Sequence, residues 1–125
     1  MKTKHYDSMT DYDSEVDILY IYPSDYKGQV NYSIDFDDTI IDIGKNNLIV
    51  GVEIIDASKK FQWGGIDSKS ALQNIKKSYL RVKYGIDSFM VNFGFMALVN
   101  KKELENQMIL QLPLKRAMLE QPINS

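Results

Sequence analysis

Five polar side chains with the chemistry of a binding or acid-base site occur in the first half of the chain: Tyr20, Ser33, Asp35, Asp42 and Glu53. Carboxylates and hydroxyls grouped together can grip a basic partner, hold a small polar ligand or transfer a proton. Each residue falls in a short segment rich in Val, Ile and Tyr, where alternate side chains point to opposite faces of a strand. All five belong to the same, mixed face, and we treat them as one candidate site.

Other catalytic chemistries lack the residues that they need. The chain has no cysteine and one histidine, His5, so thiolate zinc sites, cysteine nucleophiles and histidine metal clusters are excluded. We expect His5 to lie in a mobile amino-terminal stretch, which disfavours a Ser-His-Asp arrangement. The alternating acids of residues 11–17 do not form a calcium loop, because Val16 and Tyr22 stand where that loop needs glycine and glutamate. The sequence therefore favours a non-catalytic protein without metal or cofactor.

Four predicted strands position the candidate site, at residues 18–22, 29–36, 39–43 and 48–55. Turn residues separate them, including the pair Asp37 and Asp38, so a four-stranded antiparallel meander is the simplest topology. The short loops place Ile34 opposite Ile41 and Ile41 opposite Val50. In this register Tyr20, Ser33 and Asp42 lie side by side across three neighbouring strands.

The second half of the chain predicts a connecting helical region and another sheet. Asp56 begins a helical turn over residues 56–61, and Asp67 or Ser68 begins a helix that reaches residue 77. Strands at 79–84, 89–99 and 106–114 form a three-stranded antiparallel sheet. The two sheets bury their apolar faces in one β-rich α+β domain over residues 1–125. Met90, Met96 and Leu98 on the central strand suggest a homodimer contact.

The net charge of −2 hides two oppositely charged halves. Residues 1–57 contain 12 acids and 4 lysines, a balance of −8, whereas residues 58–125 contain 5 acids and 11 Lys plus Arg, a balance of +6. Such halves can attract each other within the fold, pair between copies or steer a charged partner. The basic face around Arg81 and Lys83 carries one aromatic residue, Tyr79, so nucleic-acid binding is not favoured.

Three segments resemble one known family. The letters YDSEVDILYI at residues 12–21, DTIIDI at 38–43 and VGVEIIDAS at 50–58 are similar to the domain-of-unknown-function family 2283. The resemblance covers about residues 12–61, the acidic meander, and leaves the basic helix and second sheet of residues 62–125 outside it. It implies a small β-meander that ends in a helix start, without assigned catalytic residues. Toxin-like genomic neighbours of family members imply an antitoxin-like role.

Two classes of function stay open at this point. In the first, the protein is an interaction module whose acidic face binds a basic protein, or a second copy of the chain. In the second, Tyr20, Ser33, Asp42 and Glu53 bind a small ligand or catalyse a reaction. The amino terminus lacks a signal-peptide pattern and no apolar run approaches the roughly 20 residues of a membrane helix, so we expect a cytoplasmic protein without a membrane partner.

Overall fold

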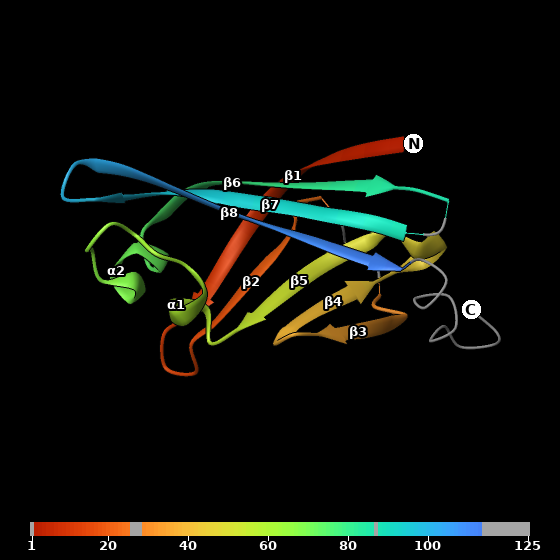
Figure 1. Ribbon diagram of the computed structural model, residues 1–125, viewed down its shortest axis with the longest axis horizontal. Helices are drawn as coiled ribbons and strands as arrows, with labels where there is room; N and C mark the ends of the chain where they lie inside the picture. Colours follow the sequence, from red (N-terminus) through yellow and green to blue (C-terminus); the bar gives the residue numbers. More distant parts are fainter. Residues whose placement is uncertain (1, 26–28, 87, 114–125) are drawn as a thin grey trace.

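The computed structural model describes residues 2–25, 29–86 and 88–113, and in this part of the chain eight strands form one antiparallel sheet (Figure 1). Their order across the sheet is β3-β4-β5-β2-β1-β6-β7-β8. The strands are β1 (Lys2–Asp13), β2 (Ile18–Pro23), β3 (Tyr32–Phe36), β4 (Thr39–Ile43), β5 (Ile49–Ile55), β6 (Ile75–Tyr84), β7 (Ser88–Val99) and β8 (Lys102–Pro113). The helical elements are short: η1 (Lys45–Asn47), α1 (Ala57–Lys60) and α2 (Ser68–Leu72).

The first strand joins the two halves of the sheet. Residues Lys2 to Asp7 pair with β6, and residues Ser8 to Asp13 pair with β2. A strand that changes partners in this way makes a corner, so the sheet curls back on itself instead of staying flat. The hydroxyls of Ser8 and Ser78 meet at 2.7 Å where β1 leaves β6. The curled sheet has the shape of a half-barrel with its core on the inner side (Figure 1).

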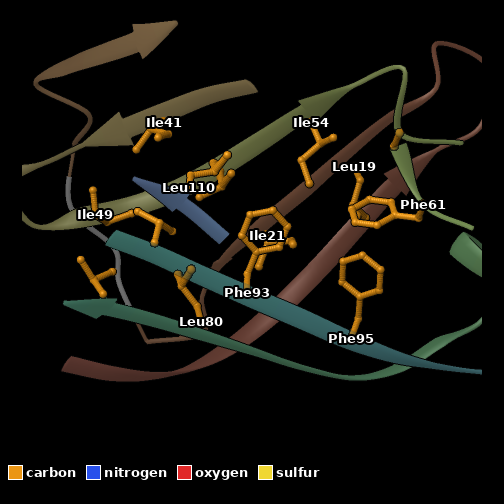
Figure 2. Close-up of a cluster of buried hydrophobic side chains, with 14 of the residues drawn as sticks. Leu19, Ile21, Ile41, Ile49, Ile54, Phe61, Leu80, Phe93, Phe95 and Leu110 are labelled. Atoms are coloured by element: carbon orange, nitrogen blue, oxygen red, sulfur yellow. The ribbon is translucent and has the colours of Figure 1, made fainter. Parts of the chain in front are cut away.

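Buried side chains from both halves of the chain form one hydrophobic cluster. Figure 2 shows Ile21, Ile41 and Ile54 of the first half facing Leu80, Phe93 and Leu110 of the second. Phe93 and Ile21 have no exposed surface. Near α1 and α2, the Phe95 ring packs edge-on against Phe61 at 4.9 Å between centroids and stacks on Trp63 at 5.9 Å. The segment between the two short helices thereby packs on β7, which α2 also contacts.

The predicted β-rich class is confirmed, but the predicted four-stranded meander packed on a three-stranded sheet is wrong. β2 pairs with β5 and with β1, and does not pair with β3. The physical reason is the unforeseen strand β1, which occupies the second edge of β2 and continues into the other half. The stretch expected to be mobile is therefore the centre of the sheet.

Several local predictions also need correction. The second helix ends at Leu72, not at residue 77, because Ile75 already begins β6 and pairs with Ala97. Strand β8 begins at Lys102, four residues earlier than predicted. Ile41 pairs with Val52, not Val50. The β4–β5 turn is one residue longer than predicted, with Ile43 opposite Ile49, and the bulge between Asp42 and Ile43 adds a second residue.

Other local predictions are confirmed. Ile34 pairs with Ile41. Asp37 and Asp38 form the tight turn between β3 and β4, both with positive φ as a type I′ turn requires. Asp67 caps α2 by accepting a hydrogen bond from the Ser70 backbone nitrogen at 3.0 Å. The last residue of the third predicted strand of the second sheet, Leu114, lies outside the described residues.

Candidate functional site

The outer surface of the first half of the sheet is an acidic face. Asp11, Tyr20, Glu53, Ile40 and Asp35 form one continuous cross-strand row, because each is paired with the next along β1, β2, β5, β4 and β3. A second row joins Ser33, Asp42 and Gly51. The outward positions of these strand segments are Met9, Asp11, Asp13, Ile18, Tyr20, Tyr22, Ser33, Asp35, Ile40, Asp42, Gly51, Glu53 and Ile55. They include five carboxylates and neither lysine nor arginine.

Three of the five predicted site residues are joined by hydrogen bonds. The Tyr20 hydroxyl donates to Asp42 Oδ2 at 3.2 Å, and the Ser33 hydroxyl donates to Asp42 Oδ1 at 2.7 Å. Both oxygens of the Asp42 carboxylate are thus held in place. The sequence predicted this trio on the assumption of neighbouring strands, yet β5 lies between Tyr20 and Asp42. The three residues meet, although the topology assumed for them was wrong.

Gly51 explains how Tyr20 reaches across a whole strand. It pairs with Asp42, and the Tyr20 ring lies where a side chain at position 51 would stand. A Cβ atom on Gly51 would come within 2.6 Å of Tyr20 Cζ, closer than real Cβ contacts allow. Tyr20 also stacks on Tyr22, with 5.2 Å between ring centroids. The absence of a side chain at Gly51 therefore leaves the space in which the Tyr20 hydroxyl reaches the Asp42 carboxylate.

The electrostatics of this trio suit binding better than acid-base catalysis. Burial, with the charges of Asp42 and Glu53, raises the pKa of Tyr20 to about 12. At neutral pH its hydroxyl therefore keeps its proton and donates a hydrogen bond to Asp42. A general acid or base works best when its pKa lies near the ambient pH, and the pKa of Tyr20 does not. His5 lies on β1 opposite Arg81, in the other half of the sheet. The remaining predicted residues, Asp35 and Glu53, lie in the neighbouring row and point to solvent from the same face.

Replacing Gly51 by alanine tests this arrangement. The added methyl group must push the Tyr20 ring aside and break its hydrogen bond to Asp42, so we expect the free energy of unfolding to fall by about 1 to 2 kcal/mol. Denaturant titration of G51A, Y20F and the double variant measures the coupling. The double variant should cost less than the sum of the single ones, because both changes remove the same bond. Full additivity would mean that Tyr20 and Gly51 act independently.

A second carboxylate cluster was missed by the sequence analysis. The Asp17 carboxylate accepts hydrogen bonds from the Tyr12 hydroxyl at 2.7 Å, the Ser58 nitrogen at 2.9 Å and the Ser58 hydroxyl at 2.6 Å. Its carbonyl accepts another from the Ala57 nitrogen at 3.0 Å. We call Tyr12, Asp17 and Ser58 the Asp17 latch, because they tie the β1–β2 turn to the start of α1.

The latch has an electrostatic signature and a sequence signal. Burial alone would raise the pKa of Asp17, but the hydrogen bonds from Ser58 and Tyr12 outweigh it and hold the pKa below its usual value. Asp56, the expected cap of the first helix, has a positive φ and makes no capping bond. The signal lay in the family-like segments: Tyr12 begins the first, Asp17 lies within it, and Ser58 ends the last.

The other half of the sheet repeats the glycine gap without a charge. Tyr79, Gly94 and Gln107 pair in one row, and the Tyr79 hydroxyl donates to Gln107 Oε1 at 2.9 Å. A Cβ on Gly94 would lie 2.6 Å from Tyr79 Cε1. Arg81 rests on the Tyr79 ring, 4.6 Å from its centroid.

Two hollows also open on this second half and at its border with the first. One of about 540 Å³ is lined by Lys4, His5, Arg81 and their neighbours, and one of about 620 Å³ lies over β6, β7 and β8. Neither is lined by a residue of the acidic face.

The described residues contain neither a metal-binding cluster nor a helix that could span a membrane. Among residues 2–25, 29–86 and 88–113, no three His, Cys, Asp or Glu side chains are grouped so that they could hold a metal ion. In the same ranges, no helix has the length and apolar character needed to cross a membrane.

Fold and site together define a small antiparallel β-sheet protein with a curled sheet and an acidic outer face. In a comparison with known proteins, a family model described as "Protein of unknown function (DUF2283)" matches residues 9–58 of the chain. The chain belongs to this family, as the predicted resemblance implied. The match runs from the middle of β1 to Ser58, and so includes all three residues of the Asp17 latch.

Two archaeal relatives extend the similarity into the second half. The chain is 33% identical over 101 residues to an uncharacterized protein of Methanocaldococcus jannaschii, covering 81% of this chain and 83% of that protein. It is 35% identical over 92 residues to a Methanosarcina mazei protein named "Putative hypoxanthine phosphoribosyltransferase", covering 74% of this chain and 68% of that protein. No solved structure matches the chain.

Proposed function

We propose that the protein is a non-catalytic interaction module whose acidic face binds a basic protein. The observation that carries this proposal is the distribution of charge on that face: its five adjacent strand segments carry five carboxylates, on four of the strands, and no lysine or arginine. Carboxylates gathered on one surface make its electrostatic potential more negative and speed the approach of a positively charged partner. An antitoxin-like role would be one form of this function, with a basic toxin as the partner.

The shape and rigidity of the face support a protein partner. The face is a sheet surface on which Ile18, Ile40 and Ile55 are half-buried among the acids. Protein interfaces combine such apolar contacts with a polar rim, whereas small-molecule sites are concave. Asp42 is already oriented by Tyr20 and Ser33. A fixed carboxylate loses less conformational entropy when it binds a lysine or arginine of the partner.

Partner capture followed by association kinetics tests the proposal. A tagged chain is used to recover proteins from native cells at low and at high salt, and the recovered partner is identified and purified. We expect a basic protein whose association slows as salt rises, because exposed charges are screened beyond about 10 Å at 0.1 M ionic strength. The variant D35N/E53Q removes two charges and none of the hydrogen bonds described above, so it should slow association several-fold while leaving the melting temperature nearly unchanged.

The matched control for this experiment is E103Q/E105Q. It removes the same number of charges from the outer side of β8, far from the acidic face in sheet order. The control should associate with the partner at the wild-type rate. If both variants slow association equally, only net charge matters and the acidic face is not the binding surface. If neither does, the partner contacts another surface.

The alternative is a small-ligand site or enzyme that uses Tyr20, Ser33, Asp42 and Glu53. The name of the Methanosarcina mazei relative suggests the probes, hypoxanthine and phosphoribosyl diphosphate. The carboxylates of the acidic face would repel a diphosphate, which is why we favour the interaction module. Calorimetric titration with each probe distinguishes the two functions. Binding that Asp42→Asn abolishes while the fold persists would favour the alternative.

A further inference from the structure

The two edges of the curled sheet are protected very differently. β3, at one edge, has five residues, carries Asp35 and runs directly into the turn formed by Asp37 and Asp38. β8, at the other edge, has twelve residues, and from Asn106 to Leu112 none of them is charged. Edge strands of soluble proteins are commonly kept short or charged, because their free backbone groups can pair with another strand. The middle of β8 has neither protection.

The β7–β8 hairpin fixes which backbone groups of β8 are free. Asn100 and Lys101 both have positive φ and form a two-residue turn between Val99 and Lys102, which pair directly. The two residues that flank such a turn exchange backbone hydrogen bonds, and the pattern then alternates along an antiparallel ladder. The register between β7 and β8 contains no shift. Even-numbered residues of β8 therefore bond to β7, while Gln107, Ile109 and Gln111 direct their N–H and C=O groups outward.

We infer that β8 pairs with β8 of a second copy of this chain, antiparallel about a two-fold axis at Ile109. Identical strands related by a two-fold axis present the same groups to each other, so the pairing closes as a dimer. With Ile109 opposite Ile109, the neighbouring outward pairs are Gln107 with Gln111, whose amides can bond to each other. The register sets Glu105 against Pro113, and between residues 105 and 113 no two charged residues face each other.

The side chains along this strand fit the same register. On the outer face Ile109 is 55% exposed, the most exposed of the strand hydrophobics, and in the dimer it meets its own copy. On the inner face Met108 would lie opposite Leu110, which is buried within the core cluster that Met108 packs against. The pairing thus extends the core of one copy into that of the other. It leaves the acidic face, on the opposite half of the sheet order, free to bind its partner.

Sedimentation velocity on the full chain, over micromolar concentrations, tests the dimer. The wild type should dimerise with little dependence on salt, since the middle of the paired segment, from Asn106 to Leu112, carries no charge. Ile109→Lys sets two ammonium groups opposite each other and should weaken dimerisation at least about tenfold. Ile109→Pro removes an outward N–H without breaking the β7–β8 ladder, and should also weaken it. The matched control is Leu98→Lys, an exposed leucine on the outer face of β7 that pairs with Glu103.

Hydrogen exchange distinguishes this dimer from any other. The amides of Gln107, Ile109 and Gln111 should be protected in the wild type and exchange rapidly in I109K, while amides of the core strands keep their protection. A wild type that stays monomeric at all concentrations would overturn the inference, including the case in which β8 binds a strand of a different protein. A dimer that persists in both Ile109 variants, or that leaves these amides unprotected, would overturn it as well.

Discussion

Phe93→Ala is expected to lower the free energy of unfolding by about 3 to 5 kcal/mol, the range for deleting a large buried aromatic side chain. Phe93 is the largest of the fully buried side chains and has no exposed surface. It lies on β7, where it faces Ile21 of the first half across the core (Figure 2). Because this one cluster holds side chains of both halves, the loss should shift a single unfolding transition and not that of the second half alone.

Calorimetry and hydrogen exchange measure this result. In scanning calorimetry the wild type and Phe93→Ala should each show one transition, with the same ratio of calorimetric to van't Hoff enthalpy. Globally protected amides in β5 and in β7 should lose the same amount of protection. Ile86→Ala is the control, because this side chain is fully exposed and its loss should change stability little. Two separate transitions, only one of them moved by Phe93→Ala, would contradict the predicted one-domain organisation.

Strong alternation of apolar and polar residues made most of the strands predictable. Leu80 and Val82 in β6, and Phe93 and Phe95 in β7, alternate with polar or outward residues, and all four are buried. β1 escaped detection because its inward positions, Tyr6, Ser8, Thr10 and Tyr12, contain no aliphatic residue and are only half-buried. They line the corner of the sheet, where β1 passes from β6 to β2. A strand without aliphatic residues at its inward positions can therefore lie at the centre of a sheet, because those side chains are only half-buried.

Topology could not be predicted because the decisive pairings are not local. The β2–β5 pair joins residues more than thirty positions apart, and the β1–β6 pair joins residues more than seventy positions apart. A local rule prefers hairpins between consecutive strands, and it holds here for β1 with β2, β3 with β4, β4 with β5, β6 with β7, and β7 with β8. It fails where an earlier strand supplies a better partner.

The grouping of the candidate site residues on one surface was predictable even though the predicted topology was wrong. The faces of β2, β3 and β4 follow from alternation alone, so Tyr20, Ser33 and Asp42 had to share one surface. Their contact also needed Gly51, whose missing side chain lets Tyr20 cross β5. The Asp17 latch could not be derived in this way, because Asp17 lies in a turn and Ser58 at a helix start, where no periodicity applies. Tyr12 lies in β1, the strand that was not predicted. Only the family-like segments marked these residues.

Asp17→Asn is expected to lower the free energy of unfolding at neutral pH by about 1 to 3 kcal/mol, since a carboxylate that accepts several hydrogen bonds cannot be replaced by an amide without losing some of them. Three donors point at the two oxygens, from the Tyr12 hydroxyl and from the nitrogen and hydroxyl of Ser58. An asparagine offers one acceptor oxygen, and its NH₂ group would face a donor. Denaturant titration measures the loss.

The same carboxylate should make stability depend on pH in acid. Hydrogen bonds hold the pKa of Asp17 in the folded protein below its ordinary value of 3.8. Its stabilising contribution is therefore fully present above that ordinary value and is lost as pH falls through the lower, folded-state pKa. Asp17→Asn lacks the titrating group, so the gap in stability between it and the wild type should be widest at neutral pH and should narrow in acid. Asp11→Asn, an exposed acid of β1, is the control and should change the pH profile little. A gap that stays constant down to the acid transition would mean that Asp17 stabilises the fold through its shape and not through its charge.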